Sequence, residues 1–195
     1  MFRLIIFDFD DTLVHLGVNW AAVRRDVVAL AKKHSIKIDT KQHLVLISNS
    51  VAAQPSLKKD VDEIFEKHEG ECIAEKSYFA LPRMIELSKR AKTKGYSLAI
   101  ASGNCTSTIE TILSGLGILA NFDVICGRDC VEKNKPSPRQ IFYIISKLGV
   151  KKEETIFIGN SGFDGLAALA AEVAYFRIKD PEKDAERASK ILGLH

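Results

Sequence analysis

Two aspartates, Asp8 and Asp10, directly follow the apolar segment Leu4–Phe7. Side chains two residues apart in an extended backbone point the same way, so both carboxylates face one side. An ionised carboxylate at the end of a buried strand is costly unless it is paired or holds a metal ion. Mg²⁺ is a hard cation that prefers such oxygen ligands. The pair therefore favours a functional metal site over an acidic surface loop.

Polar residues also follow the later apolar segments of strand length. They are Ser102-Gly103-Asn104, Gly127-Arg128-Asp129 and Gly159-Asn160-Ser161-Gly162-Phe163-Asp164. Ligands of an open parallel sheet bind beyond the carboxyl ends of its strands, so we expect these residues at one edge. Lys135 lies between two of these strands and beside the same edge, although most lysines in loops are surface charges. Pro136 is expected at the first position of a helix that begins beside Lys135.

Five short apolar segments, rich in β-branched and aromatic residues, predict the strands that position these groups. They are Leu4–Phe7, Leu98–Ala101, Phe122–Cys126, Thr155–Ile158 and Val173–Ile178. Nearly continuous apolar runs of this length are typical of strands buried on both faces of a parallel sheet, and helical patterns of crossover length separate them. The predicted fold class is therefore α/β.

The gap between the first and second predicted strands spans roughly 90 residues, far more than one crossover needs. It contains helical patterns and no convincing strand. The helical patterns are Asn19–His34, Thr40–Val51 and Ser56–His68. Gly17 and the segment Phe79–Pro82 interrupt the pattern at its two ends. We expect a small helical subdomain, inserted after the first strand.

Composition excludes several classes of protein. The chain has 195 residues, 46% of them hydrophobic and 27% charged, which suits one globular domain with an insertion. A formal charge of +3, spread in short runs, leads us to expect no nucleic-acid or membrane partner. Four cysteines without a C-x-x-C spacing and the lack of a signal-length apolar segment predict a cytoplasmic protein. Oligomeric state is not indicated.

Other patterns are better explained by structure than by chemistry. The run 115–120 fits G-x-G-x-x-A, but it follows a helical pattern and precedes a strand, the reverse of a dinucleotide fingerprint, so we expect a helix end. No P-loop motif and no i, i+4 pair of histidine ligands occurs. Cys105 is expected at a helix start, His15 at a hinge or surface, and Trp20 and Tyr78 in packing of the insertion.

Four motifs, taken in order, resemble those of the haloacid dehalogenase (HAD) superfamily, in particular its phosphoglycolate-phosphatase-like members with a helical cap. They are Asp8-Phe9-Asp10-Asp11-Thr12 for D-x-D-x-T, Ile100–Asn104 for an apolar strand ending in Ser or Thr, Lys135-Pro136-Ser137-Pro138, and Gly159–Asp164 for G-D-x-x-x-D. The resemblance covers essentially the whole chain. It implies a Rossmann-like three-layer core with a parallel five-stranded sheet at residues 1–14 and 82–195, and an all-helical C1-type cap at 15–81.

The resemblance also implies a covalent phosphoryl transfer. Asp8 would be the nucleophile that forms an aspartyl-phosphate. Asp10 would protonate the leaving oxygen, then deprotonate the attacking water, and offer its backbone carbonyl to the metal. The dehalogenases of the superfamily generally lack an acid at the position of Asp10, so the resemblance favours a phosphatase.

Binding roles follow from the same resemblance. A cation beside Asp8 is needed because a phosphoryl group and a carboxylate repel each other, and Lys135 would supply it. The implied phosphate-binding residues are Ser102, Gly103, Asn104 and Lys135. The implied Mg²⁺ ligands are Asp8, Asp10, Asn160 and Asp164.

Asn160 departs from the family pattern, which usually has a metal-binding aspartate at this position. An amide oxygen still coordinates Mg²⁺, but without a formal charge it should hold the cation more weakly. This leaves three interpretations open: a weaker metal site that still works, an altered catalyst, or a protein captured or engineered with a reduced site.

The leading hypothesis is an Mg²⁺-dependent hydrolase of a small cytoplasmic phosphate monoester. One alternative is a sugar phosphomutase-like transferase, which uses the same core but shields the aspartyl-phosphate from water. Another is a catalytically weak phosphate-ligand-binding or regulatory protein, suggested by Asn160. A phospho-accepting receiver does not fit, because the third predicted strand ends in Cys126-Gly127 without an acceptor aspartate. The substrate itself does not follow from the sequence.

Overall fold

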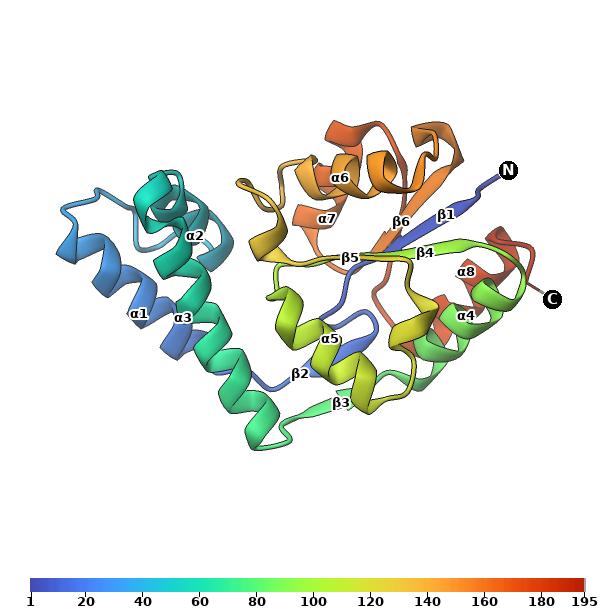
Figure 1. The fold of residues 1–195 in the computed structure, drawn as a ribbon, viewed down its shortest axis with the longest axis horizontal. Coiled ribbons are helices and arrows are strands. Elements are labelled where there is room, and N and C mark those ends of the chain that lie inside the picture. Colours follow the sequence, from blue (N-terminus) through green and yellow to red (C-terminus); the bar gives the residue numbers. More distant parts are fainter. Residues whose placement is uncertain (195) are drawn as a thin grey trace.

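A parallel five-stranded sheet lies at the centre of the computed structural model, which describes residues 1–194 (Figure 1). Its order is β5-β4-β1-β6-β7. The strands are β1 (Leu4–Phe7), β4 (Ser97–Ala101), β5 (Val124–Cys126), β6 (Thr155–Gly159) and β7 (Ala174–Arg177). Each predicted strand is present, with its ends within two residues of those expected, so the predicted α/β fold is confirmed.

Helices cover both faces of the sheet, as Figure 1 shows. One face carries α4 (Pro82–Thr93), α5 (Thr106–Gly115) and α8 (Pro181–Ile191), and the other carries α6 (Arg139–Leu148) and α7 (Gly162–Ala171). Alternate residues of the central strand enter these two layers: Ile5 and Phe7 the first, Leu4 and Ile6 the second. Burial on both faces explains the unbroken apolar run of β1. Three short 3₁₀ turns, η1 (Leu119–Asn121), η2 (Arg128–Cys130) and η3 (Lys152–Glu154), complete the core.

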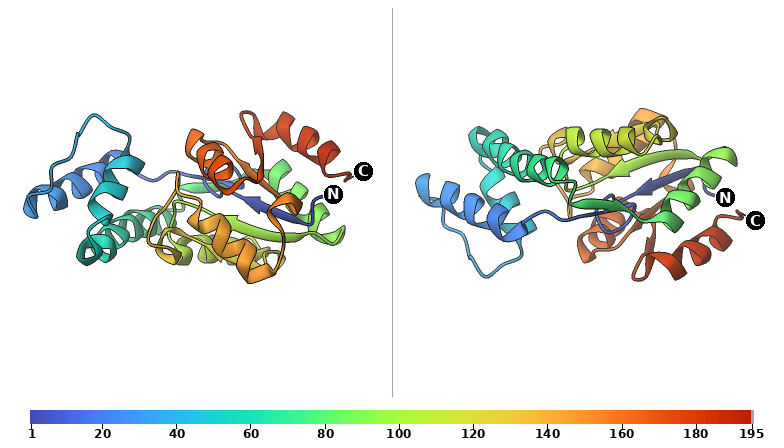
Figure 2. Two further views of the ribbon diagram at one scale, coloured as in Figure 1. Left: turned by 90° about the horizontal axis from the view of Figure 1, so that it is seen from above. Right: turned by 90° about the horizontal axis from the view of Figure 1, so that it is seen from below.

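Three helices between the first two strands of the sheet form the predicted insertion. They are α1 (Trp20–Lys33), α2 (Leu44–Ala52) and α3 (Pro55–Ala74). We call them the cap helices; they pack against one another at one end of the molecule (Figure 2). Asn19 caps α1 by accepting a hydrogen bond from the backbone of Ala22, and Pro55 opens α3. No helix within residues 1–194 is both long and apolar enough to cross a membrane.

The prediction of no strand in the inserted stretch is wrong at its two ends. β2 (Val14–Leu16) and β3 (Tyr78–Ala80) form an antiparallel pair, with Val14 opposite Ala80. Both strands are three residues long, too short to carry a period-2 pattern, and their partners lie far apart in the chain. This pair joins the cap helices to the core.

The helix expected to begin at Pro136 begins three residues later, at Arg139. Ser137 precedes Pro138, and a residue before proline is disfavoured in the α-helical region, so the helix starts only after the second proline. The end of α5 matches its prediction: the helix stops at Gly115, and Gly117 has a positive φ of 67°.

Candidate active site

A cavity of about 780 Å³ lies between the carboxyl edge of the sheet and the cap helices. The predicted residues Asp8, Asp10, Ser102, Lys135 and Asn160 line it from the core. Each belongs to a strand end or to the segment before α6, as the topology of a parallel sheet requires. The fold thus brings together residues that are far apart in the sequence.

Lys135 is a buried amine between two carboxylates. Its Nζ donates to Asp8 Oδ1 at 2.8 Å, to Asp164 Oδ1 at 2.6 Å and to the carbonyl of Ala101 at 3.1 Å. Burial alone would lower the pKa of Lys135, but Asp164 and Asp8 raise the pKa above its ordinary value. Lys135 therefore stays charged, and two carboxylates share one cation.

Asp8 follows β1 and is only 6% exposed. Its backbone N–H donates to the carbonyl of Ile158 on the neighbouring strand, which holds it at the sheet edge. Burial and the negative charge of Asp164 raise the pKa of Asp8 to about 6, although Lys135 acts in the opposite direction. The carboxylate of Asp8 is thus ionised at neutral pH although it is buried away from water.

Asp10 lies beside Asp8 at the cavity wall. Its Oδ1 accepts a hydrogen bond from the backbone N–H of Leu16 in β2, at 2.9 Å. Burial raises the pKa of Asp10 to about 7, and the hydrogen bond from Leu16 only partly offsets this. A carboxyl group with a pKa near neutrality can both give and take a proton, which is the behaviour that the sequence resemblance implies for Asp10.

Asp164 lies in the first turn of α7 and is completely buried. One oxygen accepts from Lys135, and the other accepts from the backbone and hydroxyl of Ser161 at 2.9 and 2.7 Å. Ser161 in turn caps the helix through the backbone N–H of Asp164. Asp164 thus holds the amine of Lys135 in place through this hydrogen bond. Direct coordination of a metal by Asp164 stays a prediction.

The loop Ser102–Asn104 follows β4. Ser102 Oγ donates to Asn104 Oδ1 at 2.9 Å and accepts from the backbone N–H of Asn104 at 3.2 Å. The backbone carbonyl of Gly103 accepts from Arg128. All three predicted loop residues line the cavity, and their role in phosphate binding stays a prediction.

Asn160 follows β6 and is half-buried. Its backbone carbonyl accepts from Arg177, whereas its side chain makes no hydrogen bond within the part of the chain that the structure describes. Its amide is therefore available to a ligand. Whether it binds a metal stays a prediction.

Several cavity residues were not predicted from the sequence. Trp20 was expected only to pack the insertion, but it lines the cavity with Phe65, at 6.3 Å between ring centroids. His43 lines it too and lies 4.9 Å from the ring of Phe163. Arg128, which was expected at this edge of the sheet, lines the cavity; the contact of its buried guanidinium, 3.3 Å above the ring of Phe65, was not predicted. These contacts join distant residues, so no spacing in the sequence could have indicated them.

A family model for haloacid dehalogenase-like hydrolases matches residues 5–178. The chain belongs to this family. The match includes the four motifs and the cap helices, so the family resemblance predicted from the sequence is confirmed for nearly the whole chain.

Two curated relatives of this haloacid dehalogenase-like hydrolase are phosphoglycolate phosphatases. The protein from Colwellia psychrerythraea is 31% identical over 186 residues, which cover 88% of this chain and 81% of that protein. The protein from Haemophilus influenzae is 29% identical over 190 residues, covering 89% and 84%. The predicted assignment to the phosphoglycolate-phosphatase-like phosphatases of the family is therefore confirmed.

A solved structure shares the fold. CbbY from Rhodobacter sphaeroides, in complex with phosphate, superposes on this haloacid dehalogenase-like hydrolase with a TM-score of 0.62 at 21% identity. The match covers 90% of this chain and 85% of that chain. At this identity the likeness shows the common fold.

Proposed function

We propose that this protein is an Mg²⁺-dependent phosphatase that hydrolyses a small phosphate monoester through an aspartyl-phosphate on Asp8. The contact that carries the proposal is the buried amine of Lys135, held between Asp8 and Asp164 at the cavity. The names of the curated relatives, phosphoglycolate phosphatases, support a phosphate ester as the substrate class. We further infer that the protein acts in the cytoplasm and that residues 15–81 act as its cap.

The reaction has two steps in this proposal. In the first, a carboxylate oxygen of Asp8 forms a bond to phosphorus, the ester oxygen leaves, and Asp10 gives that oxygen its proton. In the second, Asp10 takes a proton from water, the water oxygen bonds to phosphorus, and the Asp8–phosphorus bond breaks to release phosphate. The two pKa values support this division, since Asp8 must be ionised when Asp10 is protonated.

Lys135 and Ser102 would hold the phosphoryl group. Lys135 already donates to Asp8, so its charge lies where phosphoryl oxygens must approach that carboxylate. Without this cation the two anionic groups would repel each other at the reacting centre. Ser102 Oγ, at the end of β4, would turn its proton from Asn104 Oδ1 to a second phosphoryl oxygen. The exposed backbone of Gly103 leaves that side open.

The donors at the site fit a magnesium ion. Carboxylate and amide oxygens of Asp8, Asp10 and Asn160 line one cavity, and oxygen is the donor that Mg²⁺ prefers. Asp8 and Asp164 together carry more negative charge than the single amine of Lys135 neutralises. When bound, the ion would supply positive charge to the phosphoryl oxygens and help keep Asp8 ionised.

The direct test is hydrolysis of an aryl phosphate by the intact chain, with Mg²⁺ and with EDTA. We expect turnover that requires the metal ion and releases stoichiometric inorganic phosphate. Absence of hydrolysis at saturating Mg²⁺ would overturn the proposal. Formation of a sugar bisphosphate from a sugar monophosphate would instead indicate a phosphomutase.

Replacing Asn160 by aspartate should tighten Mg²⁺ binding. The change adds one formal charge at a cavity residue whose side chain has no hydrogen bond to lose within residues 1–194. We expect the half-saturating Mg²⁺ concentration for hydrolysis to fall about tenfold, which corresponds to about 1.4 kcal/mol. Asn121→Asp, at a half-buried position in η1 that does not line the cavity, is the control and should leave the half-saturating Mg²⁺ concentration unchanged. An equal or higher Mg²⁺ requirement in Asn160→Asp would show that Asn160 is not a ligand.

A further inference from the structure

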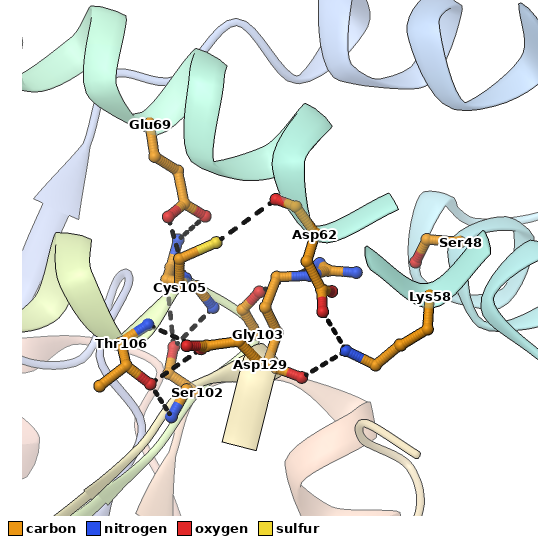
Figure 3. Close-up of polar contacts among 12 residues, drawn as sticks. Ser48, Lys58, Asp62, Glu69, Ser102, Gly103, Cys105, Thr106 and Asp129 are labelled. Carbon is orange, nitrogen blue, oxygen red and sulfur yellow. Dashed lines mark hydrogen bonds and ion pairs between the residues drawn. The ribbon is translucent and has the colours of Figure 1, made fainter. Parts of the chain in front are cut away.

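Glu69 is a buried carboxylate that the reaction above does not use. It lies on cap helix α3, is completely shielded from solvent, and points toward the start of α5 in the core (Figure 3). Its two oxygens accept from Asn104 Nδ2 at 3.0 Å and from the backbone N–H of Cys105 at 2.9 Å. Burial raises the pKa of Glu69 above its ordinary value despite these bonds. A carboxylate in such a costly place requires an explanation.

The contact with Glu69 orients the side chain of Asn104. A carboxylate accepts hydrogen bonds and does not donate them, so the amide must turn its NH₂ group toward Glu69. The amide oxygen then faces Ser102, whose Oγ donates to it at 2.9 Å. Flipping the amide would place oxygen against carboxylate oxygen. A chain of two hydrogen bonds therefore runs from the cap to the hydroxyl of Ser102.

We propose that Glu69 is a positioning residue for phosphate binding. It orients the Asn104 amide and, through it, fixes the position of the Ser102 side chain in the loop. When phosphate binds, the single hydroxyl proton of Ser102 turns from Asn104 Oδ1 to a phosphoryl oxygen. A residue of the cap thus completes the phosphate-binding loop of the core, and docking of α3 is coupled to the order of that loop. The inference rests on the proposed function, because Ser102 is a phosphate-binding residue only if that function holds.

Plain docking of the cap is the competing explanation, and the same helix offers a control. Glu66, one turn before Glu69, accepts from the hydroxyl of Ser107 at 2.7 Å in an exposed contact with α5. Asp62 forms an ion pair with Arg128 at 2.9 Å. The Glu66 contact docks α3 on the core without reaching the loop Ser102–Asn104, whereas Arg128 also donates to the carbonyl of Gly103 in that loop, so only Glu66 serves as the control. Loss of a docking contact alone can therefore be measured separately.

The decisive experiment measures binding of inorganic phosphate to the intact chain by calorimetry in Mg²⁺. Glu69→Gln keeps the shape of the side chain but places an NH₂ group against the N–H donors of Asn104 and Cys105. We expect about tenfold weaker phosphate binding, because small misplacements of binding groups are costly. Glu66→Gln should bind phosphate within about twofold of the natural chain. An unchanged affinity in Glu69→Gln, or equal losses in both variants, would overturn the inference.

A double-mutant cycle with Ser102 tests the route of the effect. Because Glu69 acts through Ser102, adding Glu69→Gln to Ser102→Ala should weaken phosphate binding no further. A full additional tenfold loss in the Ser102→Ala background would show that Glu69 acts by another route. If Glu69→Gln does not fold, Glu69→Asp keeps the charge but shortens the side chain, so it loosens the contact with Asn104 and should also weaken phosphate binding; an affinity equal to that of the natural chain would overturn the inference.

The outcomes also separate the inference from the proposed function. A natural chain that binds phosphate and hydrolyses the aryl phosphate, with Glu69→Gln equal to it, refutes the inference alone. A natural chain that neither binds phosphate nor hydrolyses the ester refutes both.

Discussion

Replacement of Asp8 by asparagine is expected to abolish hydrolysis, lowering kcat by more than about 10⁴-fold. An amide oxygen is a poor nucleophile, so the covalent intermediate cannot form at this position. Lys135 keeps its contacts with Asp164 and the carbonyl of Ala101, which preserves the shape of the site. The measurement is aryl phosphate turnover in Mg²⁺ by the purified variant beside the natural chain.

The same variant should fold at least as stably as the natural chain. The pKa of Asp8 is about 6 in the folded protein, above its ordinary value of 3.8, because of burial and of Asp164. As the pH rises from about 3.8 to about 6, the unfolded chain loses this proton before the folded chain does, so the folded state loses stability over that range. The cost is complete at pH 7, where a neutral amide removes it. Thermal unfolding at pH 7 in EDTA checks the point. Asp39→Asn, at an exposed cap position, is the matched control for turnover. Mg²⁺-dependent turnover above about 1% in Asp8→Asn would contradict the nucleophile role.

Replacing Lys135 by methionine should reduce both activity and stability. Methionine keeps much of the side-chain length but removes the cation shared by Asp8 and Asp164. Two like charges then remain buried, and we expect the free energy of unfolding to fall by about 3 kcal/mol. We expect kcat/KM for the aryl phosphate to fall by about 10³-fold, because no amine offsets the repulsion between phosphoryl group and Asp8. Urea denaturation and steady-state kinetics measure the two effects.

Two further variants separate charge from packing at this site. Lys133→Met removes an exposed lysine from the same loop and should leave both quantities unchanged. Adding Asp164→Asn to Lys135→Met removes one of the unpaired charges, so stability should recover while activity does not. A Lys135→Met protein as stable as the natural chain would show that the ion pair contributes nothing to folding.

The core of the fold was predictable because its pattern is local. All four residues of Leu4–Phe7 are buried, so the strand shows as an unbroken apolar run with Asp8 at its end. Strands β2 and β3 were missed because three residues give no period, and their pairing depends on how the cap is joined to the core. The start of α6 was misplaced because Pro136 suits a first helical position while Pro138 excludes Ser137 from the helix.

The residues of the candidate site also fall into those predicted from the sequence and those that only the structure showed. Asp8, Asp10, Ser102 and Asn160 were predicted because a parallel sheet brings all its carboxyl ends to one edge, whatever the details of packing. The sequence predicted that Lys135 lies at the same edge of the sheet as Asp8, but not that its amine contacts both Asp8 and Asp164. Its buried position, with one amine serving two carboxylates, came from the structure.

The sequence by itself determined the α/β class, the helical insertion and the family, because each shows in the order and spacing of neighbouring residues. Only the tertiary structure decided which cap residues face the cavity and that Glu69 reaches Asn104, which lies 35 positions further along the chain. That contact depends on the packing of α3 against α5, and side-chain packing between separate elements leaves no periodic trace in the sequence.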